Sequence, residues 1–149
     1  MMDEKQLEAF LQENKVVYEI QEHKEGVLGA KDTVKYFDPE LCAAVYVIDT
    51  ERGLAAMIVN AKRDSMDIGA LEYVLGYRVT GKADPRIVKQ ATGYEAGSLP
   101  LIGHNLPILF DKSLTIHDYI YGLTGDKVHT IKIRPEDVIR LNTMLEFIE

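Results

Sequence analysis

Length, composition and charge limit the class of protein that this sequence can encode. The chain has 149 residues, 46% of them hydrophobic and 28% charged, which is typical of one soluble globular domain that needs no disulfide or structural metal. Its formal net charge of −7 argues against a protein that coats DNA or RNA through bulk electrostatic attraction. Its one cysteine, Cys42, excludes an internal disulfide and a cysteine-based zinc site.

No membrane or export segment is visible in the sequence. The longest apolar run, residues 41–48, is well short of the roughly 20 residues that a membrane-spanning helix needs. The first residues, MMDEKQLEAF, have neither the basic start nor the apolar core of a secretory signal. We therefore expect a cytoplasmic protein without a membrane partner.

The start of the chain predicts a helix, a strand and then a segment without a clear pattern. Asp3 and Gln6 have the spacing of a capping box, and apolar residues at helical spacing continue to about residue 14. Residues 16–20 are rich in β-branched and aromatic side chains, which is typical of a strand. Residues 24–40 contain two glycines and an Asp-Pro pair, and we assign no firm structure to them.

A β-hairpin is predicted in the centre of the chain. The runs AAVYVID (43–49) and LAAMIVN (54–60) have the composition of strands. The polar TERG between them ends in Gly53, which can adopt the positive φ of a tight turn. We therefore expect the two runs to form adjacent antiparallel strands.

Two helices follow the hairpin, each with an aspartate at its start and a glycine at its end. They cover residues 67–76 and 84–93, where the aspartates cap the helices and the glycines supply left-handed ends. Pro85 occupies the first position of the second helix, where a missing N–H costs nothing. A short strand at residues 77–80 joins the two helices.

The last third of the chain begins with a loop and ends with a helix. Residues 93–107 hold three glycines and two prolines, which indicates an irregular loop. Three strand candidates follow: PILFD (107–111), DYIYG (118–122) and VHTIKI (128–133). Pro135 then begins a final helix that extends to the end of the chain. Its inward-facing residues would be Val138, Leu141, Leu145 and Ile148.

The order of these elements predicts the fold class. Six or seven strands and four helices without regular alternation place the chain in the α+β class. We expect a mixed, largely antiparallel sheet or partial barrel with flanking helices. Because no internal repeat or linker divides the sequence, residues 1–149 form a single domain.

The motifs of common cofactor and metal enzymes are absent from the sequence. It contains no GxGxxG, GxxxxGK[ST] or HExxH, so we expect no cofactor and neither nucleotide hydrolysis nor zinc-protease chemistry. Its histidines are far apart, which favours surface or hydrogen-bonding roles over a metal site. They are His23, His104, His117 and His129. Ser98, either His104 or His129, and Asp111 could form a triad, but any chain of this size contains such a set.

The glycine-bearing stretch over residues 97–103 is the most informative candidate for a site. Gly97 and Gly103 would let backbone N–H and C=O groups approach a ligand closely and hold a small polar group without side chains. A plain turn across one end of the sheet explains the same residues equally well. Residues 60–90 carry six basic against four acidic side chains, so a local basic face could hold phosphates or could be ordinary solvated charge.

From about Glu19 onward the sequence resembles the YbaK and prolyl-tRNA editing family, whose members remove wrongly attached amino acids from tRNA. The resemblance rests on the order of several segments. They are YEIQEH, AAVYVID, LAAMIVN, MDIGALEYVLG, ADPRIVKQATGYEAGSLPLIG, LPILFDKSL, DYIYGLTGD and HTIKIRPEDVIRL. The succession of TGYxxG, PxxxDxSL and PEDVIRL is the most specific part. The resemblance implies a YbaK-like α+β fold.

The resemblance also implies an activity and a set of site residues. Water would attack the ester of an aminoacyl-tRNA, oriented by backbone groups and by the substrate's own 2′ or 3′ hydroxyl rather than by a strong side-chain base. The amino acid would lie beside the glycine-bearing loop, with the terminal adenosine nearby. Catalytic roles are implied for Gly97, Ser98, Asp111 and His129. Substrate-binding roles are implied for Ala44, Leu101, Gly103, His104, Gly122 and Gly125.

Two positions depart from the family's pattern. Family members carry a lysine in the first hairpin strand, where it helps to position the tRNA end, and here that position holds Ala44. The proline of the family's GxxxP loop falls on Leu101, with Pro100 displaced by one residue, so substrate preference does not carry over. A nearby lysine could substitute for the missing cation. The candidates for tRNA contacts are Lys31, Lys35, Lys62, Arg63 and Lys82.

Three functional interpretations follow from these observations. The first is a trans-acting aminoacyl-tRNA deacylase of unknown specificity. The second is a noncatalytic relative that binds tRNA, an aminoacyl-type ligand or another protein, and Ala44 in place of the lysine favours it. The third is a small interaction domain without a ligand pocket, which the glycine-bearing loop makes less attractive.

Overall fold

Two β-sheets form the framework of the protein. The computed structural model describes residues 1–63 and 65–149. One sheet has five strands in the order β4-β2-β3-β5-β8, and the other has three in the order β1-β7-β6. The strands are β1 (Tyr18–Glu22), β2 (Ala43–Thr50), β3 (Gly53–Asn60), β4 (Val79–Lys82), β5 (Pro107–Asp111), β6 (Ile120–Leu123), β7 (His129–Ile133) and β8 (Thr143–Ile148).

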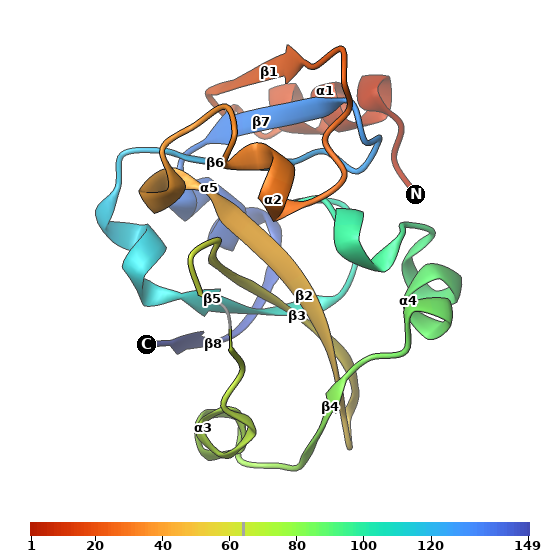
Figure 1. The fold of residues 1–149 in the computed structure, drawn as a ribbon, viewed down its shortest axis with the longest axis vertical. Coiled ribbons are helices and arrows are strands. Elements are labelled where there is room, and N and C mark those ends of the chain that lie inside the picture. The colour runs from red at the N-terminus through yellow and green to blue at the C-terminus, as the bar shows by residue number, and fades with distance from the viewer. Residues whose placement is uncertain (64) are drawn as a thin grey trace.

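Five α-helices and three short 3₁₀ turns connect these strands within the described residues. The helices are α1 (Glu4–Glu13), α2 (Ala30–Thr33), α3 (Ile68–Leu75), α4 (Pro85–Thr92) and α5 (Pro135–Leu141). The 3₁₀ turns are η1 (Pro39–Leu41), η2 (Ala96–Ser98) and η3 (Lys112–Ile116). Figure 1 shows α1 and the three-stranded sheet at one end of the molecule, and α3 and β4 at the other. None of the described helices has the length and apolar character needed to cross a membrane.

The central hairpin forms as predicted and leaves one edge of β2 open. β2 and β3 pair antiparallel along their whole length, and Gly53 turns the chain with φ of 103°. On its other side β2 pairs with β4 only from Ile48 to Thr50, and it makes one isolated bridge at Cys42. Between these two points the backbone around Val45 has no strand partner in the described part of the chain.

The five-stranded sheet has apolar side chains on both faces, because successive residues of a strand point to opposite sides. Val45 and Val47 of β2 pack in a core that also contains Leu11 of α1 and Ile131 of β7. Ala44, Ile48 and other residues of the same sheet pack on the opposite face, where α3 contributes Leu71. The first face therefore lies against the three-stranded sheet, and the second lies under α3.

The predicted helix ends are confirmed at the level of individual caps. Asp3 and Gln6 form a reciprocal capping box at the start of α1. The carboxylates of Asp67 and Asp84 accept backbone N–H groups at the starts of α3 and α4. Both helices end at glycines in the left-handed conformation, as predicted. The expected α+β class with a mixed sheet is therefore correct, and the two sheets of the described chain do not close into a barrel.

The prediction of one long C-terminal helix is wrong. The helix α5 ends at Leu141, and residues 143–148 form β8, which pairs in parallel with β5. Asn142 ends the helix by donating its side-chain N–H to the carbonyls of Val138 and Leu101. The apolar spacing of residues 143–148 fits a helix as well as a strand. They form a strand because β5, which is distant in the sequence, supplies backbone hydrogen-bond partners that the spacing does not reveal.

Candidate functional site

The candidate site is a cavity of about 400 Å³ at the open edge of β2. Residues 28–32, which lead into and form most of α2, make one wall, and residues 43–46 of β2 make another. Gly97, Leu99 and Leu123 complete the lining. Figure 1 shows α2 beside β2, which is how a segment near the start of the chain reaches the central hairpin.

The backbone of β2 presents hydrogen-bonding groups to this cavity. The carbonyl of Val47 accepts the N–H of Ala83, so it points away from β3. Because the direction of backbone groups alternates along a strand, the N–H and C=O of Val45 point to the same side as those of Val47. No strand of the described chain pairs with Val45 on that side. A ligand in the cavity therefore meets one donor and one acceptor of Val45.

Gly97 supplies a second backbone donor and an open wall. It lies in the first turn of η2, where N–H groups lack partners within the helix, and its own N–H has none among the described residues. A Cβ added at Gly97 would meet no atom within 4 Å. At Gly29, in contrast, an added Cβ would lie 3.1 Å from the carbonyl oxygen of Gly97. Gly29 therefore permits the close approach of α2 to η2, whereas Gly97 leaves space free.

Lys31 and Asp32 are the charged residues among those that line the cavity. The carboxylate of Asp32 accepts the N–H of Leu28 at 2.9 Å and the Nζ of Lys35 at 3.1 Å. These two hydrogen bonds hold the pKa of Asp32 below its usual value, so its negative charge persists at neutral pH. Lys31 makes no ion pair within residues 1–63 and 65–149. The remaining lining is largely apolar or backbone.

Three of the residues predicted for the site line this cavity: Lys31, Ala44 and Gly97. Ala44 belongs to the β2 wall, but its side chain packs in the core under α3. Ser98 is buried beside the cavity, where its hydroxyl donates to the carbonyl of Leu28 and ties η2 to the segment before α2. The wall over residues 28–32 was missed, because those residues carried no clear pattern.

Asp111 lies outside the cavity, and its carboxylate binds backbone and side-chain groups of other segments. Its side chain is 1% exposed. It accepts the backbone N–H groups of Asn60 and Ser113, each at 2.9 Å. Its carboxylate also lies 3.6 Å from the Nε of Arg63. The predicted catalytic role of Asp111 stays a prediction, and it would require a substrate that reaches beyond the cavity lining.

His129 also lies outside the cavity, between two carboxylates. Its Nδ1 contacts the carboxylate of Asp126, and its Nε2 lies 3.6 Å from the carboxylate of Glu4. The backbone bonds from Val128 and His129 to Asp126 contribute to lowering the pKa of that carboxyl despite its partial burial. His129 thus connects α1 to the start of β7, and its catalytic role stays a prediction.

The other loop residues predicted to bind substrate serve packing in this structure. A Cβ at Gly122 would lie 2.5 Å from the side chain of Leu101, and one at Gly125 would lie 2.4 Å from the ring of Tyr94. Gly103 has φ of 102°. These three glycines let the chain approach its neighbours closely, and neither they nor Leu101 line the cavity.

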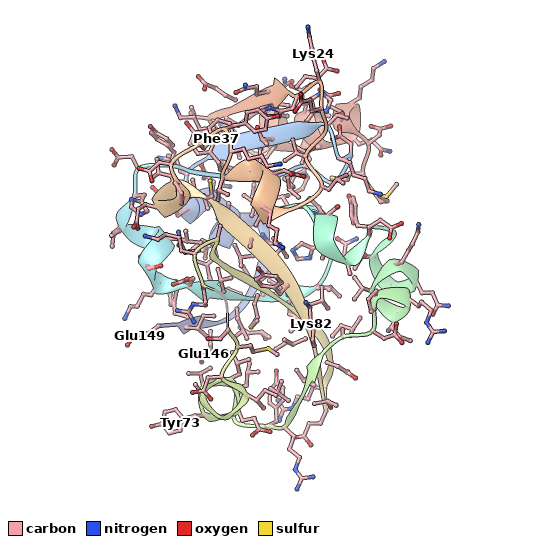
Figure 2. The ribbon with its side chains drawn as sticks, in the orientation of Figure 1. Lys24, Phe37, Tyr73, Lys82, Glu146 and Glu149 are labelled. Atoms are coloured by element: carbon pink, nitrogen blue, oxygen red, sulfur yellow. The ribbon has the colours of Figure 1, made fainter. Side chains whose placement is uncertain are left out.

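The remaining predicted cations lie elsewhere on the surface. Lys35 pairs with Asp32, and Lys62 pairs with Glu40. Lys82 and Arg63 border a different cavity on the face of the sheet that carries α3. Figure 2 shows Lys82 and Tyr73 around β4 and α3, away from Phe37 near the three-stranded sheet. Lys31 is therefore the one member of this group that reaches the cavity beside Gly97.

Comparison with known proteins gives an independent description of this arrangement. A family model described as an aminoacyl-tRNA editing domain matches residues 24–141. That range contains every segment that lines the cavity at the β2 edge. Among curated proteins no relative matches this chain.

Several solved structures share the fold at low sequence identity. One is a "putative trans-editing enzyme for prolyl tRNA synthetase", 18% identical, with 98% of each chain covered and a TM-score of 0.78. The hypothetical protein APE2540 is 14% identical over 93% of this chain and 96% of its own, with a TM-score of 0.79. A structure from work on computational epitope grafting onto scaffold proteins is 21% identical over 87% of this chain and 85% of its own, with a TM-score of 0.74.

Proposed function

Because the chain belongs to the aminoacyl-tRNA editing domain family, we propose that it is a trans-acting deacylase that hydrolyses the ester of a mischarged aminoacyl-tRNA. The observation that carries this proposal is the cavity that Val45 of β2, Gly97 of η2 and Lys31 of α2 line together. Its volume of about 400 Å³ lies within the range of small-molecule sites. A cavity of this size accommodates an aminoacyl group rather than a whole nucleotide chain.

The chemistry assigned to the cavity uses backbone groups. The Gly97 N–H donates to the carbonyl oxygen of the ester as negative charge develops there. The carbonyl of Val45 accepts the α-ammonium group of the amino acid, and the negative charge of Asp32 favours the same cation. Water adds to the ester carbon, the bond to the ribose oxygen breaks, and the departing ribose oxygen takes up a proton. The neighbouring ribose hydroxyl orients that water.

Lys31 takes the part that the family's missing lysine would play. Lys31 lines the cavity from α2, and Ala44 lines it from β2. A phosphate of the tRNA's terminal nucleotides is the natural partner for an unpaired lysine at the mouth of an aminoacyl pocket. The apolar lining by Leu99 and Leu123 favours an amino acid with an apolar side chain.

Two matched lysine variants test this assignment. Lys31→Ala should lower kcat/KM for deacylation by roughly tenfold or more, because a phosphate contact near the reacting ester is lost. Lys62→Ala removes a lysine that pairs with Glu40 outside the cavity, and its rate should stay within about twofold of wild type. The rates are measured on a panel of tRNAs mischarged with different amino acids. An equal loss in both variants, or none in Lys31→Ala, would contradict the role of Lys31.

A noncatalytic relative that binds tRNA is the second candidate, and one observation favours it. The two predicted titratable catalytic groups, Asp111 and His129, are absent from the cavity lining. In that case the protein should bind tRNA with an affinity that falls steeply with salt, because phosphate contacts release counterions, but no amino acid should be released. Measuring binding and deacylation in the same salt series separates the two candidates.

A further inference from the structure

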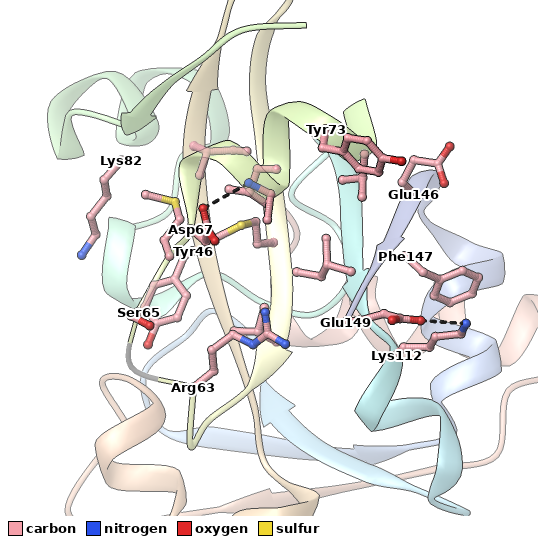
Figure 3. A pocket seen from close by; sticks show the side chains of 18 of the residues that line it. Tyr46, Arg63, Ser65, Asp67, Tyr73, Lys82, Lys112, Glu146, Phe147 and Glu149 are labelled. Carbon is pink, nitrogen blue, oxygen red and sulfur yellow. Dashed lines mark hydrogen bonds and ion pairs between the residues drawn. The ribbon is translucent and has the colours of Figure 1, made fainter. Parts of the chain in front are cut away.

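A second and larger cavity lies on the face of the five-stranded sheet that α3 covers. Its volume is about 950 Å³, and it is enclosed by β2 and β3, by α3 and by the C-terminal strand β8. Figure 3 shows its labelled side chains arranged around the sheet. This size is in the upper part of the range found for small-molecule sites. The mechanism proposed for the β2 edge does not use this space.

The floor of this second cavity is apolar because it is made by alternate residues of the central hairpin. Ile48 of β2 and Met57 and Val59 of β3 point to this face, and Leu71 of α3 closes one wall. Tyr46 lies on the same face and is only partly buried. The floor therefore offers an apolar surface with one aromatic ring, which suits a flat hydrophobic group.

One side of the cavity carries two cations, and one of them lies over that ring. The Nζ of Lys82 lies 5.6 Å from the ring centroid of Tyr46, and Lys82 forms no ion pair among the residues described. Arg63 is 34% exposed, and its Nε lies 3.6 Å from the buried carboxylate of Asp111. Figure 3 shows Lys82 and Arg63 on the same side of the cavity as Tyr46.

Asp111 forms an ion pair with Arg63 at the border of this cavity. Two backbone N–H groups, from Asn60 and Ser113, fix the Asp111 carboxylate. Its interaction with Arg63 uses the Nε, so the terminal guanidinium nitrogens are left to bind an anion. A buried carboxylate that accepts two backbone N–H groups thus lies beside the Nε edge of the Arg63 guanidinium group.

The opposite side of the cavity has acceptor groups. Glu146 and Glu149 border it together with Phe147, and Figure 3 shows these three across from Tyr46. Glu149 is paired with Lys112 at 3.2 Å, whereas Glu146 has no ion-pair partner in the described part of the chain. Two further charged side chains border the cavity: Asp67, whose carboxylate accepts the N–H of Ala70, and Lys112, which pairs with Glu149. Glu146 therefore remains a carboxylate without an ion-pair partner among the described residues, and it lies across the cavity from Lys82 and Arg63 (Figure 3).

We propose that this second cavity binds a nucleoside monophosphate unit. Arg63 and Lys82 hold the phosphate, because guanidinium and ammonium groups are the strongest protein partners for it. The base lies on the apolar floor against Tyr46, since every base has a face that stacks on an aromatic side chain. The carboxylate of Glu146 accepts a hydrogen bond from an exocyclic amino group of the base. The same chemistry is offered by a free nucleotide and by the terminal nucleotide of a tRNA.

Calorimetric titration with AMP tests the proposal, with adenosine and inorganic phosphate as partial ligands. AMP should bind roughly tenfold or more tightly than either part alone, because base and phosphate are held at once. Lys82→Ala and Tyr46→Leu should each weaken AMP binding by roughly tenfold. Tyr77→Leu is the matched control, because Arg52 lies 4.4 Å from the Tyr77 ring centroid in a similar pair outside both cavities. AMP binding no tighter than phosphate binding would overturn the proposal, as would an equal loss in the control.

Two further measurements show where the nucleotide comes from and whether this cavity binds it independently of the cavity at the β2 edge. Displacement of AMP by intact tRNA, but not by tRNA that lacks its terminal adenosine, assigns the site to the tRNA end. Failure of both tRNAs to displace AMP assigns it to a free nucleotide. Gly97→Val, which fills the other cavity, should leave AMP binding unchanged, so failure of the proposed deacylation would not affect this result. Loss of AMP binding in Gly97→Val would overturn the placement of the site.

Discussion

His104 is a buried titratable residue whose effect on stability can be derived from its surroundings. It is 1% exposed, its Nδ1 accepts the N–H of Leu106, and its Nε2 has no hydrogen-bond partner among the described residues. Burial disfavours the charged imidazolium and lowers the pKa of His104 from 6.5 to about 4. A buried Nε2 without a hydrogen-bond partner lowers the free energy of unfolding, and packing in the surrounding core must offset that loss.

The lowered pKa of His104 predicts a loss of stability at acidic pH. As pH falls below 6.5, the unfolded chain takes up a proton at this histidine before the folded protein does, so the free energy of unfolding decreases until about pH 4. Between pH 7 and pH 5 this group should account for about 2 kcal/mol. His104→Asn keeps an acceptor for Leu106 and removes the titration, so urea unfolding at both pH values should show a smaller decrease. An unchanged decrease would contradict this assignment.

Individual residues were predictable where local chemistry alone determines their role. The caps Asp67 and Asp84 and the turn glycine Gly53 do in the structure what their sequence context indicates. Gly97 was singled out for the same reason, and it does line a cavity. Asp111 and His129 were chosen by resemblance, and neither lines it. The surroundings of each include a residue far away in the chain, Asn60 for Asp111 and Glu4 for His129, which no local pattern encodes.

At the scale of elements, the loop after η2 is held against β6 by one close contact. Leu101 is fully buried, its N–H donates to the carbonyl of Leu123, and its side chain occupies the volume above Gly122. This contact fixes the loop that follows Gly97 and Leu99, so it sets the position of one wall of the β2-edge cavity.

A double-mutant cycle measures that contact. Gly122→Ala should destabilise the protein by about 1–3 kcal/mol, because its Cβ would lie 2.5 Å from the Leu101 side chain. Leu101→Ala should cost about 2–5 kcal/mol through the cavity it leaves. The double variant should be more stable than the sum of the two losses predicts, because the new methyl group occupies vacated space. Simple additivity in urea unfolding would show that the two residues are not in contact.

The strands were predictable from the sequence where their composition and flanking turns mark them. The β2–β3 hairpin and the strands β5, β6 and β7 were found from composition and turns. β8 was not, because its one strand partner in the described part of the chain is β5, and the parallel pair of Phe110 with Phe147 links distant parts of the sequence. The α2 wall of the cavity was missed for a related reason. A four-residue helix has too few residues for a periodic pattern.

At the scale of the whole molecule, two cavities adjoin the five-stranded sheet, and Tyr46 of β2 lines both of them. One lies at the edge of β2 beside Gly97, and the other lies on the face covered by α3. Both use the same hairpin, the first through its backbone edge and the second through side chains such as Tyr46. In a chain with a net charge of −7, two lysines that form no ion pair within the described residues, Lys31 and Lys82, thus lie at cavities. This arrangement favours selective contact with a few phosphates over nonspecific binding.

The most direct test of the proposed function is single-turnover deacylation of a mischarged tRNA panel by wild-type protein and Gly97→Val. An added side chain at Gly97 enters free space, since its Cβ would meet no atom within 4 Å, so the melting temperature should not change. We predict that the wild type hydrolyses at least one mischarged tRNA and that Gly97→Val is slower by roughly tenfold or more. Wild-type rates in a fully folded Gly97→Val protein would contradict the placement of the aminoacyl group in this cavity.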